Sequence, residues 1–465
     1  MFVPIKVRVL TDETGAATEL PGLLTPAGVL TPLLDYCLAR SHDRSIEWMY
    51  KVRRAVHLFL EYLQSNPGQR DTSLLFRNFA QRLTSGTFDP ATGLDPSGLC
   101  WSPRTAVDAR HILSDLNNFF DWLSASRPAA GLLNPRYQGT GFDLACDEAA
   151  AVHRRERAFL GHLWSSGGSD TGRAVRAKRA PTVAASEPPA FPDDKFGALL
   201  AEGFKRGSRP DYRGILITLL CHGAGFRESE PFHLYIEDVV PDPVNPRMAR
   251  VRIHHPSEGF APAGWVDARG RPRTGTRAAY LAEKYGLVPR TALLDSRAAG
   301  WKGGTHDGPV YKEAYWFQPE FGELFLKVWW LYLREVAMVD RDHPFAFINL
   351  SRAPLGDMYT LAQYNKAHAR ACERIGLTAK KELGTTPHGH RHAYGRRLKN
   401  AGVEPAFIKR FMHHASLESQ EVYTQPTSAE TVAALEHAAV RLQSGLPADR
   451  LPMPSLLGFT GALDE

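Results

Sequence analysis

The sequence predicts a mainly helical α+β protein, in which a helical N-terminal domain precedes a mixed domain with a small β-sheet. With 465 residues the chain is too long for one hydrophobic core, so two or three domains are expected. Apolar residues recur at three- and four-residue steps over long stretches, which is typical of helices that pack on a core. In the short stretch Ala249–His254 they alternate with arginines, which is typical of a strand. Hydrophobic residues make up 43% of the chain and charged residues 23%, as in folded globular proteins.

Residues 1–128 are predicted to form a compact bundle of about four helices. One spans residues 45–64, a shorter one spans 72–83, and another begins at Ser102 and Pro103, a helix cap followed by a residue suited to the first helical position. The apolar face of the first of these helices consists of Met49, Val52, Val56, Phe59 and Leu63. On composition alone, this could equally be a helical domain without chemistry of its own.

Residues 129–194 are predicted to be an interdomain linker. Between 151 and 180 the basic residues outnumber the acidic ones, and 181–194 is rich in proline and alanine. Such a basic segment can be a solvated charge run or a strap that follows a phosphate backbone.

The second domain is predicted to cover residues 195–445, with a tail at 446–465 for which no structure is predicted. Apolar stretches at 211–223 and 324–339 indicate buried helices, and 358–375 indicates an amphipathic one.

Charge and cysteine content narrow the class of protein. A net charge of +6 and a pI near 9.0 permit a polyanionic partner without requiring one. The five cysteines form no CxxC pair, which favours a reducing compartment and argues against a disulfide framework. Because the first residues lack a signal-peptide pattern and no apolar stretch is long enough to span a membrane, we expect a cytoplasmic protein without membrane contact.

A first candidate site lies at residues 225–231, after an apolar helix that its glycines should end. We expect Arg227 at the start of a new helix, where backbone N–H groups and a guanidinium can bind an anion together. The simpler interpretation is a surface ion pair between Arg227 and Glu230 that contributes little.

Two further clusters lie near the end of the chain. In the first, His388 and Arg391 are three residues apart and would share one face of a helical turn. In the second, Tyr423 follows His414 by nine residues. Histidines at 388, 390 and 392 also suggest a metal site, but residues two apart on a helix point in different directions.

The order and spacing of these clusters resemble the tyrosine recombinases, the phage integrase family. The matching pattern is Arg227-x-x-Glu230, then His388-x-x-Arg391-His392, then His414 and Tyr423. Further similar stretches are 234–238 after the first arginine, 347–355 before the second cluster, and the N-terminal bundle, which resembles the family's core-binding domain.

The resemblance implies a DNA strand transesterification in which Tyr423 attacks the scissile phosphate and forms a 3′-phosphotyrosyl link. It implies that Arg227 and Arg391 bind the non-bridging oxygens, and that His388 and His414 donate hydrogen bonds and assist proton transfer. It further implies double-stranded DNA as partner, four protomers on two duplexes, and no metal, ATP or other cofactor. Glu230 is then expected to orient its neighbours.

In the family, a lysine on a β-hairpin between the first arginine and the His-x-x-Arg motif protonates the leaving 5′-oxygen. Here the hairpin is expected to be expanded by an insert at about 255–308. We expect Lys302, in a glycine-rich turn, to be this acid, with Lys312 as the second choice and Lys284 as a distant third.

Two positions depart from the family pattern. His390 replaces a leucine and could add a polar group near the phosphate, and His413 replaces a glycine where backbone usually packs closely.

The predicted function is a site-specific recombinase or integrase of a mobile genetic element. The alternatives are a type IB topoisomerase-like enzyme and a DNA-binding protein that has lost catalysis.

Overall fold

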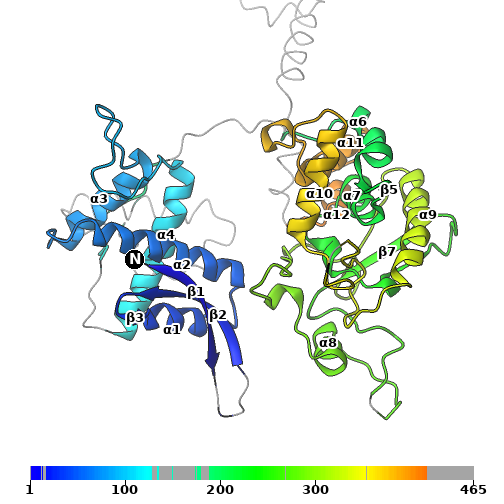
Figure 1. The fold of residues 1–465 in the computed structure, drawn as a ribbon, viewed down its shortest axis with the longest axis horizontal. Coiled ribbons are helices and arrows are strands. Elements are labelled where there is room, and N and C mark those ends of the chain that lie inside the picture. Colours follow the sequence, from blue (N-terminus) through cyan, green and yellow to red (C-terminus); the bar gives the residue numbers. More distant parts are fainter. Residues whose placement is uncertain are drawn as a thin grey trace, which may run out of the picture. The chain divides into compact units, whose positions relative to one another are not determined.

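The computed structural model describes residues 2–415 except 12, 14–16, 128–132, 136–148, 150–172, 174, 180–187, 268 and 352. The chain forms two compact units, Met1–Val183 and Ala184–Glu465 (Figure 1). Small antiparallel sheets accompany many helices, so the predicted α+β class is confirmed. Among the described residues no helix is long and apolar enough to cross a membrane.

The first unit begins with a sheet that the helical prediction missed. Its strands are β1 (Val3–Leu10), β2 (Ala17–Thr25) and β3 (Gly28–Val29), antiparallel and in that order. Along β1 the half-buried Ile5, Val7 and Val9 alternate with exposed Lys6 and Arg8, as expected for a strand with one face on the core.

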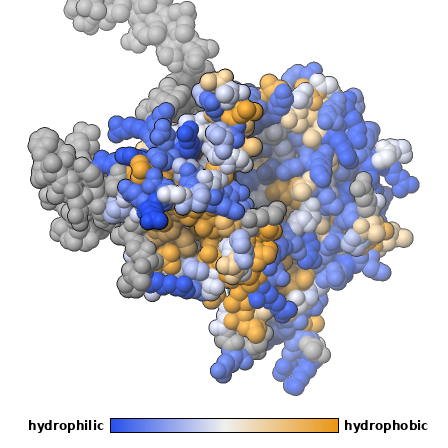
Figure 2. Space-filling model, turned by 60° about the vertical axis from the view of Figure 1, so that its left-hand side comes forward, coloured by the Kyte–Doolittle hydropathy of each residue, from blue (hydrophilic) through white to orange (hydrophobic). Residues whose placement is uncertain are grey.

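In its described part the first unit also contains α1 (Thr31–Ala39), α2 (Ile46–Gln64), α3 (Thr72–Ser85) and α4 (Ala106–Ser126). The predicted helix at 45–64 is confirmed, with Ser45 as its cap. The one expected from Ser102 begins later, because the hydroxyl of Thr105 accepts a hydrogen bond from the backbone N–H of Asp108 and caps α4. Figure 2 shows apolar surface bordered by polar surface on the face that it views.

The second unit is built around α7 (Tyr212–Ala224), in which every residue from Arg213 onward is buried. This helix packs against α9 (Pro319–Val336), α10 (Leu361–Arg374) and α11 (Pro387–Asn400). Three of these helices, α7, α9 and α10, confirm predicted ones with shifted ends. The unit begins with α6 (Asp193–Ala198), a π-helical turn (Leu199–Gly203) and the small hairpin β4 (Lys205–Arg206) with β5 (Arg209–Pro210).

A three-stranded antiparallel sheet has the order β6 (Val239–Pro241), β7 (Ala249–His254) and β8 (Tyr311–Glu313). Since β7 pairs directly with β8, the residues between them form an insert in a hairpin, and the insert carries α8 (Arg277–Tyr285). The unit's last described helix is α12 (Pro405–Phe411).

Residues expected in the linker take part in this unit. Phe191 is fully buried, and its backbone N–H donates to the carbonyl of Gly389 at 3.0 Å. The domain boundaries drawn from composition stay predictions.

Candidate active site

A buried carboxylate organises the turn that follows α7. Gly225 ends this helix in the left-handed conformation, with φ of 71°. The chain then reaches a one-turn 3-10 helix, η4 (Glu230–His233), and Pro231 lies in its first turn. Arg227 therefore precedes a 3-10 turn and does not begin an α-helix, so that part of the expectation is wrong.

Glu230 accepts hydrogen bonds from three donors. Its Oε1 accepts from Lys312 Nζ at 2.6 Å and from Arg227 Nη1 at 3.1 Å, and its Oε2 accepts from the backbone N–H of Arg227 at 2.8 Å. The side chains of Glu230 and Lys312 are fully buried, and that of Arg227 is 16% exposed. The interpretation as a surface ion pair is therefore wrong, because this pair is enclosed in the core.

The charges around Glu230 keep it ionised. Burial by itself would raise the pKa of this carboxyl, but the neighbouring Lys312, Arg227 and Arg391 lower it to about 2. The pKa of Lys312 is also lowered, by burial first and then by the two guanidiniums, against the attraction of Glu230. Three cations thus surround one anion, and a further anion would be bound favourably beside them.

Arg391 joins two turns that are far apart in sequence. Its side chain is buried on α11 and donates to the carbonyl of Gly225 after α7 and, at 2.6 Å, to the carbonyl of Met412 after α12. The fixed backbone acceptors hold the guanidinium next to Arg227 and Glu230, where its charge contributes to the low pKa of Glu230.

His388 and His414 lie close to both arginines. Burial, followed by the charges of Arg391 and Arg227, lowers the pKa of His414 to about 3. The same causes in the same order lower the pKa of His388 to about 4, and Lys302 also contributes. The side chain of His388 reaches solvent, which moderates the effect of burial. Both imidazoles are neutral at pH 7, so each can donate one hydrogen bond and accept one.

The structure thus brings together the predicted Arg227, Glu230, His388, Arg391 and His414. Tyr423 lies outside the described residues. So does the stretch 427–444, for which the spacing of Val432, Leu435, Ala439 and Leu442 predicts an amphipathic helix.

The chain was compared with known proteins in three ways. Residues 332–430 match the phage integrase family. This match covers about a fifth of the chain, and within it the chain is similar to the tyrosine recombinases. A comparison with curated proteins finds no match.

Several solved structures are similar. The XerH site-specific recombinase bound to difH substrate is 12% identical over 89% of this chain and 84% of that chain, with a TM-score of 0.46. A lambda integrase (75–356) dimer bound to a COC′ core site is 11% identical over 85% and 95%, with a TM-score of 0.42. The Tn1549 transposon integrase (82–397) with circular intermediate DNA is 16% identical over 83% and 99%, with a TM-score of 0.31. The similarity to the phage integrase family rests on the sequence match of residues 332–430, since all three TM-scores lie below 0.5.

The three candidate lysines differ in their surroundings. Lys302 is exposed in the last part of the insert, and its charge contributes to the lowered pKa of His388. Lys312 is enclosed in β8, where its ammonium lies 4.3 Å from the centre of the Trp301 ring and donates to Glu230 and to the Lys302 carbonyl. Lys284 lies on α8, where it contacts Tyr280 and Tyr285.

The suggestion that His390 adds a polar group near the phosphate is wrong. Its ring is fully buried and hydrogen-bonds through Nδ1 to His222 of α7 at 3.0 Å and through Nε2 to His368 of α10 at 2.8 Å. Because adjacent residues on a helix point in different directions, the ring of His390 contacts the core while the side chain of Arg391 lies in the site.

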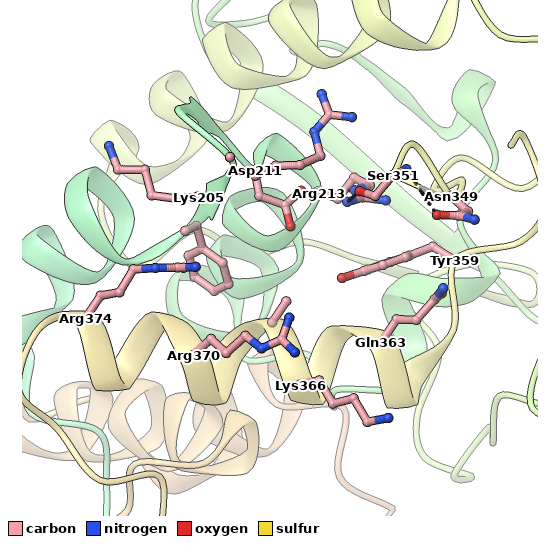
Figure 3. Close-up of a pocket in the computed structure, with 14 residues that line it drawn as sticks. Lys205, Asp211, Arg213, Asn349, Ser351, Tyr359, Gln363, Lys366, Arg370 and Arg374 are labelled. Atoms are coloured by element: carbon pink, nitrogen blue, oxygen red, sulfur yellow. Dashed lines mark hydrogen bonds and ion pairs between the residues drawn. The ribbon is translucent and has the colours of Figure 1, made fainter. Parts of the chain in front are cut away.

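A basic cavity of about 430 Å³ lies beside α10. Among the described residues that line it, six are cationic and one, Asp211, is acidic; the cations are Lys205, Arg206, Arg213, Lys366, Arg370 and Arg374. Figure 3 shows Arg370 and Arg374 on the α10 side of the cavity and Lys205 and Arg213 across from them. Lys366, Arg370 and Arg374 are spaced four residues apart and so share one face of the helix, which is the signal in the sequence that could have predicted this site.

Proposed function

We propose that this tyrosine recombinase cuts and rejoins DNA strands at specific sites through a 3′-phosphotyrosyl link to Tyr423, as the recombinase of a mobile genetic element. The observation that carries the proposal is the cluster of two guanidiniums and two neutral imidazoles from three remote parts of the chain, around Arg227, His388, Arg391 and His414. Such a cluster suits a phosphodiester, whose transition state places added charge on the non-bridging oxygens.

In the proposed reaction the phenol of Tyr423 loses its proton, its oxygen bonds to phosphorus, and the bond from phosphorus to the 5′-oxygen breaks. A phenol has a pKa near 10 and needs a base or a stabilising charge at neutral pH. His388 suits the base, because its lowered pKa leaves the imidazole unprotonated, and a bound phosphate would raise that pKa as the proton arrives. His414 and the arginines suit hydrogen bonds to the oxygens.

The leaving 5′-oxygen takes a proton, and we assign that role to Lys302. This lysine is exposed beside His388, whereas the Lys312 ammonium is enclosed and bonded to Glu230. The lowered pKa of Lys312 makes it the second candidate, since it would release a proton more readily than an ordinary lysine. A 5′-thiol leaving group needs no acid, so the cleavage defect of Lys302→Ala should disappear on a 5′-phosphorothiolate strand. Lys312→Ala should stay slow on that strand, because it removes the lysine that is hydrogen-bonded to the buried Glu230.

The basic cavity at α10 supports DNA as the substrate. Its cations come from α10, from β4 and from α7, and neutralising phosphates with them would release counterions. Lys366→Ala and Arg370→Ala should each weaken DNA binding and reduce the salt slope by about one. Lys327→Ala, on the exposed side of α9, removes the same charge and serves as the control.

We also propose that four protomers assemble on two duplexes through helix 427–444, docked on a neighbouring copy. An apolar groove of about 450 Å³ lies between α11, α12 and the segment 314–317 that follows β8, and it is a suitable acceptor. Its lining residues include Trp316, Phe317, Leu398 and Phe411. The apolar stripe Val432, Leu435, Ala439 and Leu442 fits such a groove. Truncation after residue 426 should leave DNA binding intact but abolish tetramers in analytical ultracentrifugation, whereas a helix docked within its own chain predicts no change in assembly.

The central test is the covalent adduct on a nicked suicide substrate. Wild-type protein should form it in EDTA, Tyr423→Phe should bind DNA but form none, and Tyr285→Phe should act as wild type. An adduct that survives in Tyr423→Phe excludes this nucleophile, and loss of the wild-type adduct in EDTA would revive a metal site. Absence of any adduct would favour a DNA-binding protein without catalysis, and relaxation of supercoils without joining of two duplexes would favour the topoisomerase alternative.

A further inference from the structure

The residue before His414 has an unusual backbone conformation. His413 has a φ of 53°, in the left-handed region that favours glycine, and glycine is the residue that the family resemblance leads one to expect there. Met412, on the other side, accepts a hydrogen bond from Arg391. The conformation at His413 therefore decides how His414 is directed relative to Arg391.

Asp307, near the end of the insert, holds the ring of His413. The carboxylate Oδ2 lies 2.7 Å from His413 Nε2, and both side chains are almost fully buried. Within the described part of the chain, Nδ1 of His413 has no hydrogen-bond partner, so Asp307 provides the one polar anchor of this ring and requires a proton on Nε2. Phe226 stacks on the ring with centroids 5.5 Å apart.

Asp307 is itself held rigidly. Its carboxylate accepts from the Tyr315 hydroxyl at 2.7 Å and from the backbone N–H of Glu313 at 2.9 Å, and Arg410 of α12 lies 3.6 Å away. Burial would raise its pKa, but these donors and His413 lower it, so the carboxylate is ionised. The anchor is thus in place before any substrate arrives.

The backbone of the same loop packs on the turn. A Cβ added to Gly304 would overlap the carbonyl oxygen of His413, whereas one added to Gly303 would meet nothing within 4 Å. The hydroxyl of Thr305 lies 3.5 Å from the carbonyl oxygen of His414. The loop therefore packs closely on the turn at Gly304, whereas there is open space for a side chain at Gly303.

We propose that residues 304–307 of the insert form a clamp that holds His413 in the left-handed conformation and thereby aims His414 at the scissile phosphate. Asp307 and Gly304 are positioning residues in this proposal, which rests on the proposed function. A glycine at 413 adopts the conformation without help, so the clamp is needed because a histidine stands there. The side chain of Asp307, near the end of the insert, thus stabilises at His413 the left-handed conformation that a glycine would adopt by itself.

The test measures single-turnover adduct formation at saturating suicide substrate, with DNA affinity and melting temperature in parallel. Asp307→Ala should slow cleavage by about tenfold or more, since small misplacements of a catalytic group are costly, while DNA affinity stays within about twofold. His413→Gly should cleave at close to the wild-type rate. The double variant Asp307→Ala/His413→Gly should recover most of the lost rate, which a merely stabilising role of Asp307 does not predict.

Two matched pairs probe the clamp without removing Asp307. Gly304→Ala should slow cleavage while Gly303→Ala leaves it unchanged, and His413→Ala should be slower than His413→Gly because alanine disfavours positive φ. These two pairs of variants test the proposed clamp even if Asp307→Ala does not fold. Wild-type rates in Asp307→Ala or Gly304→Ala, or no recovery in the double variant, would overturn the clamp while leaving the proposed function intact. Failure of the wild-type protein to form an adduct would instead overturn the proposed function.

Discussion

Replacing Glu230 by glutamine should destabilise the second unit markedly. The substitution keeps the size of the side chain but removes the negative charge that Lys312, Arg227 and Arg391 stabilise. The carboxylate of Glu230 accepts hydrogen bonds from Lys312 at 2.6 Å and from Arg227 at 3.1 Å. The amide nitrogen of glutamine is a donor and cannot accept such bonds.

The magnitude follows from the pKa of the carboxyl. Its lowering from 4.5 to about 2 corresponds to about 3 kcal/mol of preference for the ionised form at neutral pH, at about 1.4 kcal/mol for each pKa unit. Removing one partner of a buried ion pair costs about 3–5 kcal/mol in measured cases, which agrees. Because Lys312 can lose its proton in the variant, the lower figure applies, and we expect a loss of about 3 kcal/mol.

Urea denaturation of the full chain at pH 7 measures the loss. The control is Glu283→Gln, whose exposed partner Arg273 should make the substitution worth less than about 1 kcal/mol. Since the folded-state pKa of Glu230 is depressed, its contribution is complete above pH 4.5 and is lost as the pH falls toward 2. The difference between wild type and Glu230→Gln should shrink over that window. A variant as stable as the wild type at pH 7, or a difference that is the same at pH 5 and pH 3, would refute the reasoning.

Three further predictions concern single interactions in the two units. Gly225→Ala should lower the free energy of unfolding in urea by about 2 kcal/mol or more, because the new Cβ would have positive φ and would overlap the Tyr394 ring. The control Gly207→Ala has positive φ in open space and should cost about 1 kcal/mol. Equal losses would contradict the close packing at Gly225. Burial lowers the pKa of His368 to about 3, so its stabilising contribution is complete above pH 6.5 and is lost as the pH falls toward 3. His368→Gln should therefore reduce the slope of the unfolding free energy against pH, between pH 6 and 5, by up to about 1.4 kcal/mol per pH unit. An unchanged slope would exclude this depressed pKa. Asp71→Ala should cost about 1 kcal/mol by removing the cap of α3, and Asp71→Ser should restore most of it in the same assay.

Helices that bury one face were predictable because their signal is local. The spacing of Met49, Val52, Val56 and Phe59 places four buried residues on one face of α2. The sheet at the start of the chain had an equally local signal, the alternation of Ile5, Val7 and Val9 with basic residues, and it was overlooked beside the longer helical patterns.

The ends of elements were less predictable, since they depend on which polar side chain meets the free backbone N–H groups. Thr105 caps α4, although Ser102 and Pro103 have the composition of a helix start. In the same way Arg227 stands before a 3-10 turn, because Gly225 reverses the chain and Glu230 turns back to bond the backbone N–H of Arg227.

The chain sequence by itself determined the chemical groups that the structure gathers in the site, and their order: the arginines at 227 and 391 and the histidines at 388 and 414. Only the tertiary structure decided that Lys312 is enclosed with Glu230, and that Asp307 anchors His413. The physical reason is that burial of a charge depends on how distant backbone segments pack. A lysine or aspartate in a long insert follows no periodicity that would predict its partner.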